Sequence, residues 1–121
     1  MKLPYKLAKE LSDASYLQQW QDGVWYQDKR MSEAEIFHYD TKYGYRLDPM
    51  TTVAVIIPTL SELIEDVVSF SNTKGFNLKF DNKGTWIAKI DSSAGLISTE
   101  GSIPEEAVAR LWLKLKRNVM K

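Results

Sequence analysis

The segment 76–99 constrains the fold of this chain more than any other. Residues 76–80 alternate apolar and polar side chains, which is the period of a strand with one buried face. Two further β-rich segments follow at 85–91 and 96–99, and turn-forming residues separate all three. Since short turns join antiparallel neighbours, the sequence predicts a meander over 76–99. In its middle strand, Trp86, Ala88 and Ile90 fall on one face, which we expect to face the core.

Three helices are predicted outside this meander, over about 4–14, 60–71 and 104–118. The middle helix has the clearest start. Thr59 and Glu62 have the spacing of a capping box, in which the hydroxyl and the carboxylate each accept a backbone N–H of the other residue. Ser102 and Glu105 repeat this spacing before the last helix. Apolar residues recur every three or four positions in all three segments.

The region 24–57 predicts short strands with poorly defined ends. Val24–Gln27 and Tyr43–Leu47 are rich in aromatic residues, and Thr51–Ile57 is β-branched and almost wholly apolar, which is typical of strands. Ser32 and Glu35 also have capping-box spacing. The segment 31–40 is therefore either helical or extended, and the sequence leaves both alternatives open.

These elements predict an α+β fold: a small antiparallel sheet, made of the meander 76–99 plus strands around 24–57, packed with three helices. The chain has 121 residues, with no internal repeat and no linker rich in proline, glycine or serine. We therefore expect residues 1–121 to form a single domain.

Charge balance and the lack of cysteine exclude several function classes. Sixteen basic residues balance sixteen acidic ones, whereas proteins that bind phosphate backbones usually carry a basic excess. Without cysteine, disulfides, thiolate chemistry and the common zinc sites are excluded. The N-terminal residues lack the apolar core of a signal peptide, and the longest apolar run, Val53–Ile57, is far shorter than the roughly 20 residues of a membrane span. We expect a soluble, cytoplasmic protein.

The sequence predicts no catalytic or metal-binding constellation. Its only histidine, His38, would share a face with Asp40 in an extended segment and lie near Glu35 in a helical one. Either carboxylate would orient the imidazole for acid–base chemistry, but a metal site normally needs three or four ligands. Glu62, Glu65 and Asp66 are interpreted as a solvated helix face. We expect no enzyme, no metal and no cofactor, with a hydrolase-type enzyme using His38 as the remote alternative.

Aromatic residues gather in the middle of the chain. Eight of the fourteen lie between positions 16 and 45, and tyrosine and tryptophan are frequent anchors of protein interfaces. The alternative is that they pack beneath a loop-rich lobe. Alternation along a strand sends Trp25 and Tyr26 to opposite faces. The candidate aromatic patch comprises Trp25, Tyr26, Tyr39, Tyr43 and Tyr45.

A second hypothesis is single-stranded nucleic-acid binding. Lys29, Arg30, Lys42 and Arg46 lie beside the aromatic residues, which would stack on bases. Acidic residues interrupt this basic set, so we do not expect a nucleic-acid partner. The interrupting residues are Asp22, Asp28, Glu33, Glu35, Asp40 and Asp48.

Three short segments carry a resemblance that extends over nearly the whole chain. They are Tyr5-Lys6-Leu7-Ala8-Lys9-Glu10-Leu11, Ile57-Pro58-Thr59-Leu60-Ser61-Glu62-Leu63 and Ser102-Ile103-Pro104-Glu105-Glu106-Ala107. With the aromatic middle and the short meander between them, the chain resembles small proteins without assigned activity that phages and prophages of gut bacteria encode. The resemblance implies a mobile-element accessory protein and assigns no functional residues. The leading hypothesis is a non-enzymatic protein–protein interaction module, acting on an unknown protein partner or by self-association.

Overall fold

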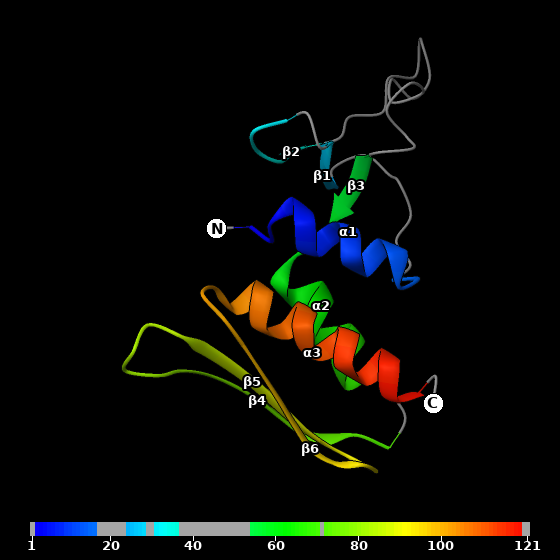
Figure 1. Cartoon of the computed structure of the whole chain (residues 1–121), viewed down its shortest axis with the longest axis vertical. Coiled ribbons are helices and arrows are strands. Elements are labelled where there is room, and N and C mark those ends of the chain that lie inside the picture. Colours follow the sequence, from blue (N-terminus) through cyan, green and yellow to red (C-terminus); the bar gives the residue numbers. More distant parts are fainter. Residues whose placement is uncertain (1, 17–23, 29–30, 37–53, 71, 120–121) are drawn as a thin grey trace. The chain divides into compact units, whose positions relative to one another are not determined.

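The computed structural model describes residues 2–16, 24–28, 31–36, 54–70 and 72–119. Over these ranges the chain forms three helices and two three-stranded antiparallel sheets (Figure 1). The predicted α+β class is confirmed, although the strands form two sheets where one was expected. In chain order the elements are α1 (Tyr5–Asp13), β1 (Trp25–Asp28), β2 (Glu35–Ile36), β3 (Ala54–Ile57), α2 (Leu60–Val68), β4 (Lys74–Phe80), β5 (Trp86–Ser92), β6 (Gly95–Gly101) and α3 (Pro104–Val119).

The contacts divide the chain into two compact units, Lys2–Pro58 and Thr59–Lys121. The first contains α1 and the sheet β2-β1-β3, and the second contains α2, α3 and the meander. The expectation of a single domain stays a prediction.

Helix α1 begins after Pro4, whose φ of −63° and ψ of 149° are extended. Leu7, Ala8 and Leu11 form its buried stripe, as predicted. The helix ends in a Schellman motif: the N–H of Tyr16 donates to Leu11 O at 2.9 Å, and Ser15 adopts a φ of 68°. On the exposed side Lys9 donates to Asp13 Oδ1 at 2.8 Å, and this hydrogen bond raises the pKa of Lys9.

The first sheet places β1 between β2 and β3. Trp25 lies opposite both Ile36 and Ile57, and Tyr26 lies opposite Glu35 and Ile56. Of the alternatives for 31–40, Glu35–Ile36 is extended, so the spacing of Ser32 and Glu35 does not start a helix there. Residues 37–40 lie outside the described ranges.

Helix α2 starts as its sequence predicts. Thr59 Oγ1 accepts the N–H of Glu62 at 3.3 Å, and Glu62 Oε1 accepts the N–H of Thr59 at 3.0 Å, which confirms the capping box. Leu63 and Val67 are buried on its inner face. The helix ends at Val68, three residues before the predicted end. Gly75, whose residue type often follows a helix end, lies in β4 with a φ of 71°.

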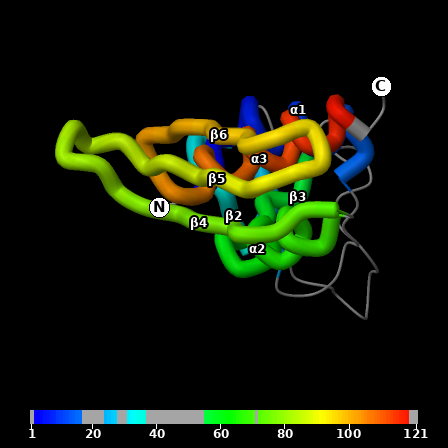
Figure 2. Tube along the Cα trace, turned by 90° about the horizontal axis from the view of Figure 1, so that it is seen from below, coloured from blue at the N-terminus to red at the C-terminus, as the bar shows by residue number. Residues whose placement is uncertain are grey.

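The meander is confirmed, with β4, β5 and β6 side by side in sequence order (Figure 2). Asp81 shapes the first turn, since its Oδ1 accepts the N–H groups of Lys83 and Thr85 at 2.8 and 3.2 Å. On the predicted core face of β5, Ala88 and Ile90 are fully buried, while Trp86 is only half-buried. Trp86 packs against Phe80 with ring centroids 5.2 Å apart.

Helix α3 packs on β5 and β6 with a stripe that includes Ala107, Leu111 and Leu115, all buried. It starts at Pro104, as predicted, but without the predicted capping box. The first backbone hydrogen bond runs from Ala107 N to Ile103 O, so Ile103 and not Ser102 precedes the first turn. Ser102 Oγ donates to Glu106 Oε1 at 2.9 Å instead.

Candidate functional site: an exposed sheet edge

Two residues of the predicted aromatic patch lie in the described ranges. Trp25 and Tyr26 are both half-buried on β1, and consecutive strand positions direct them to opposite faces of the sheet, as predicted. Tyr39, Tyr43 and Tyr45 lie outside the described residues. The patch as a whole stays a prediction, and β1 itself does not bring its two rings onto one face.

The charged end of a lysine side chain lies over the ring of Trp25. Lys2 Nζ lies 3.8 Å from the ring centroid, within the range of a cation–π contact. Lys2 is exposed, so this contact joins the N-terminal segment to β1 at the surface. One face of the Trp25 ring is therefore in contact with a residue of the same unit.

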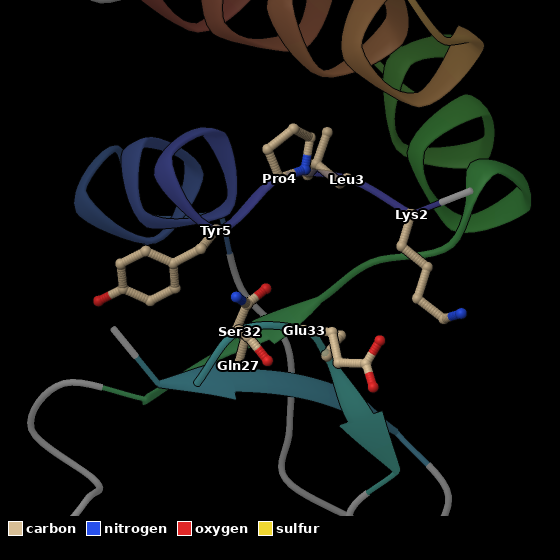
Figure 3. Close-up of a pocket in the computed structure, with 8 residues that line it drawn as sticks. Lys2, Leu3, Pro4, Tyr5, Gln27, Ser32 and Glu33 are labelled. Carbon is tan, nitrogen blue, oxygen red and sulfur yellow. The ribbon is translucent and has the colours of Figure 1, made fainter. Parts of the chain in front are cut away.

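A depression of about 430 Å³ lies close to this contact. Its walls are the N-terminal segment Lys2–Tyr5 on one side and Gln27 with residues 32–34 on the other (Figure 3). Gln27 Nε2 donates to Met31 O at 3.1 Å and so fastens the connection between β1 and β2. The charged residues of the lining, Lys2 and Glu33, are both exposed. A depression with solvated charges offers a ligand little beyond weak surface contacts.

The residues proposed for chemistry fall largely outside the described ranges. His38 and Asp40 do, as do Lys29, Arg30, Lys42 and Arg46 of the nucleic-acid hypothesis. Within the described ranges no three histidine or acidic side chains gather as metal ligands would. Among the same residues, no helix has the length and apolar character needed to cross a bilayer.

The two edges of the meander differ sharply. Along β6, the side chains of α3 bind the outer backbone: Arg110 Nη1 donates to Glu100 O at 2.7 Å, and Lys114 Nζ donates to Ser98 O at 3.3 Å. Arg110 is itself 3.5 Å from Glu106 Oε2. Covering an edge strand with charged side chains is a common way to prevent it from pairing with another chain.

The opposite edge, β4, is open to solvent along most of its length. Five of its seven residues are exposed, and Phe76 and Leu78 are half-buried. Phe80 is 55% exposed even though it contacts Trp86. Antiparallel partners share a face, so these three apolar residues lie on the same face as Ala88 and Ile90. α3 packs on the neighbouring β5 and β6.

The register shows which backbone groups of β4 point outward. Ser98 and Glu100 direct their carbonyls to α3, away from β5, and lie opposite Lys89 and Ile87. Backbone direction alternates along a strand. The N–H and C=O groups of Lys89 and Ile87 therefore point toward β4, where the partners of these residues are Asn77 and Lys79. The hydrogen bond from Asp81 N to Thr85 O continues this series. The backbone groups of Leu78 and Phe80 therefore point away from the sheet, whereas the register shifts between Lys74 and Asn77, so the series does not extend to the N–H of Phe76.

The sequence contained part of this signal. The alternation over 76–80 predicts a strand with one apolar face, but not whether the strand lies at the edge or how much of that face a helix covers. Both depend on the tertiary positions of β5, β6 and α3.

Comparison of the chain with protein-family models, with curated proteins and with solved structures finds no match.

Proposed function

We propose that this chain is a non-enzymatic protein–protein interaction module that binds an extended segment of a partner along β4. In line with its resemblance, we place it among the accessory proteins of phages and prophages, acting on a protein of the phage or of the host. The observation that carries the proposal is the exposed edge of β4.

Strand addition at a sheet edge uses two kinds of contact. Backbone hydrogen bonds provide affinity, and the side chains at alternate positions provide specificity. On β4 the outward backbone groups belong to Leu78 and Phe80, and the side chains of Phe76, Leu78 and Phe80 extend the apolar face of the sheet. The ligand expected at this edge is an extended segment with apolar residues at every second position.

Binding of a strand predicts a specific pattern of amide protection. The outward amides of Leu78 and Phe80 exchange quickly in the unbound protein, whereas those of Asn77 and Lys79 are already bonded to β5. Peptides selected from a random library for binding to the full chain are expected to slow exchange at the amides of Leu78 and Phe80. Nuclear magnetic resonance of each amide measures this change.

Two matched substitutions test the location of the site. Phe80→Lys places a charge on the apolar face of β4, while Leu96→Lys places the same charge at another exposed apolar position, which is 64% exposed on β6. We expect Phe80→Lys to weaken peptide binding at least about tenfold, which corresponds to about 1.4 kcal/mol, and Leu96→Lys to leave it unchanged. Selected peptides that bind both variants equally well, or that protect other amides, would refute the proposal.

A further inference from the structure

We infer that β4 pairs with β4 of a second copy of this chain, so that two three-stranded meanders join into one continuous antiparallel sheet. The inference rests on the proposed function, because it uses the same edge, and it identifies the partner. Four features of the meander support it: the direction of the backbone groups, the side chains of β4, its charges, and the closure of the opposite edge.

The backbone directions permit a symmetric pairing about Leu78. In this register Leu78 lies opposite the second copy's Leu78, and Phe76 lies opposite the second copy's Phe80. Leu78 and Phe80 direct their N–H and C=O groups outward, as the register with β5 requires, whereas the register shift between Lys74 and Asn77 interrupts this alternation before Phe76. The pair of Leu78 residues at the axis would therefore exchange two backbone hydrogen bonds.

The side chains of β4 complement one another in this register. Each Phe80, now 55% exposed, would be covered by the second copy's Phe76, and the two Leu78 side chains would meet at the axis. Cross-strand aromatic pairs are favourable contacts in sheets. A symmetric pairing about Asn77 would also satisfy the backbone, but it places Phe80 opposite Lys74. The register about Leu78 therefore buries more apolar surface.

The charges of β4 are compatible with the same register. Lys79 would lie opposite the second copy's Asn77, and Lys74 lies beyond the register shift of β4, outside the paired residues 76–80. No two lysines face one another, whereas a parallel pairing in register would place Lys79 beside Lys79 and Lys74 beside Lys74. Like charges directly opposite each other destabilise a sheet, so the charges favour the antiparallel arrangement.

Closure of the other edge limits the assembly to two copies. Arg110 and Lys114 bind the outer carbonyls of β6, so a sheet joined through β4 has a covered β6 at each end. A two-fold pairing that leaves no open edge forms a closed dimer and does not extend into a fibre. A short strand pair is a small interface, and we therefore expect a weak, reversible dimer.

Cysteine substitution tests the register, since the chain contains no cysteine. Asn77 and Lys79 are exposed and would face each other across the dimer as a non-hydrogen-bonded pair, for which Cα atoms lie about 4.5 Å apart, within the range of a disulfide. Mixing Asn77→Cys with Lys79→Cys is expected to give a disulfide-linked dimer faster than either variant alone. Ser98→Cys, at an exposed position on β6, is the matched control and should form a disulfide with neither Asn77→Cys nor Lys79→Cys. Equal rates in every mixture would overturn the inference.

Sedimentation equilibrium tests the dimer itself. We expect Phe80→Lys to raise the dissociation constant about thirtyfold, because an aromatic pair is lost twice in a symmetric dimer, and Leu96→Lys to leave it unchanged. The cysteine variants retain Phe80, so they keep the inference testable should Phe80→Lys fail to fold. A wild-type chain that stays monomeric while selected peptides still protect the β4 amides would refute the second copy as partner and leave strand addition standing. A dimer weakened by Leu96→Lys and not by Phe80→Lys would refute the inference. The proposed function would fail only if Leu96→Lys also weakened peptide binding while Phe80→Lys left it unchanged.

Discussion

At Gly101 the end of β6 lies close to the start of α3. A Cβ atom at this position would lie 2.6 Å from Ala107 N and 2.6 Å from Glu106 Cβ, which is closer than van der Waals contact allows. Gly101 is buried, so the surroundings cannot move aside without disturbing the start of α3. The glycine is therefore required by packing.

We predict that Gly101→Ala lowers the free energy of unfolding by about 2 kcal/mol or more, the usual cost of overpacking a well-packed site. Urea denaturation followed by circular dichroism measures it. Gly84→Ala is the comparison: Gly84 has a φ of 84°, and a Cβ atom added there would meet nothing within 4 Å, so only the backbone penalty of about 1 kcal/mol applies. Equal losses for the two variants would show that the contact with α3 is not tight.

Ser15 occupies a position that glycine usually fills. It follows α1 with a φ of 68°, in the left-handed region that disfavours residues with a Cβ. The sequence did not predict this conformation, because serine has no preference for it and the apolar stripe of α1 marks only where the helix is buried. The free-energy cost of the left-handed conformation at Ser15 arises in the folded state alone.

We predict that Ser15→Gly stabilises the protein by about 0.5 kcal/mol, since relief of the left-handed strain outweighs the greater backbone entropy of glycine in the unfolded chain. Ser12→Gly, in the body of the same helix, should instead destabilise it by about 0.5–1 kcal/mol. Thermal unfolding of both variants measures the difference. A loss of stability in both would mean that the backbone at Ser15 is not strained.

At the scale of elements, local signals were reliable where the tertiary structure agreed with them. Thr59 and Glu62 form the predicted capping box, because an apolar helical stripe follows them directly. Ser32 and Glu35 have the same spacing, yet Glu35 pairs with Tyr26 in a sheet. A capping box satisfies only the ends of a helix, so it cannot outweigh the hydrogen bonds and burial that a neighbouring strand provides.

The Thr59 cap makes a measurable contribution to the stability of the protein. We predict that Thr59→Ala lowers the free energy of unfolding by about 1 kcal/mol, because the N–H of Glu62 loses its acceptor at the start of α2. Thr59→Ser retains the hydroxyl and should change the free energy little. Urea denaturation of both variants checks this, and an equal loss for alanine and serine would assign the effect to the methyl group instead of the cap.

The covered edge of β6 predicts a second effect at this scale. Arg110 and Lys114, four residues apart on α3, donate to Glu100 O and Ser98 O. We predict that replacing both by alanine exposes the edge and promotes association into larger assemblies, seen by light scattering. Arg117→Ala, an exposed residue of the same helix, should leave the scattering unchanged. Particles that do not grow in the double variant would show that the cations do not protect this edge.

At the scale of the whole molecule, the sequence predicted the fold class better than the candidate site. Alternation at Phe76, Leu78 and Phe80 was sufficient for a strand, because side chains on a strand alternate whatever lies beside it. Whether that strand is central or at an edge depends on contacts between residues far apart in the chain. The same holds for β6, whose edge is covered by Arg110 and Lys114 from a later helix.

A β4-linked dimer predicts that stability depends on protein concentration. Association that requires the folded state stabilises it by mass action, so above the dissociation constant each tenfold rise in concentration adds about 1.4 kcal/mol per dimer, or about 0.7 kcal/mol per chain. For a domain of this size that corresponds to a rise in Tm of about 3 °C. Differential scanning calorimetry over a hundredfold range of about 10 μM to 1 mM covers the weak affinity expected of a small interface.

The variants separate the dimer from other sources of concentration dependence. In Phe80→Lys the Tm should be nearly independent of concentration over this range, while Leu96→Lys should follow the wild type. Aggregation of the unfolded chain lowers the apparent Tm as concentration rises, because it removes unfolded molecules, so the sign of the slope distinguishes it from association of the folded state. A wild-type Tm that is flat or falls with concentration would contradict the dimer, since a folded state stabilised by self-pairing must become more resistant to heat as its partner becomes more abundant.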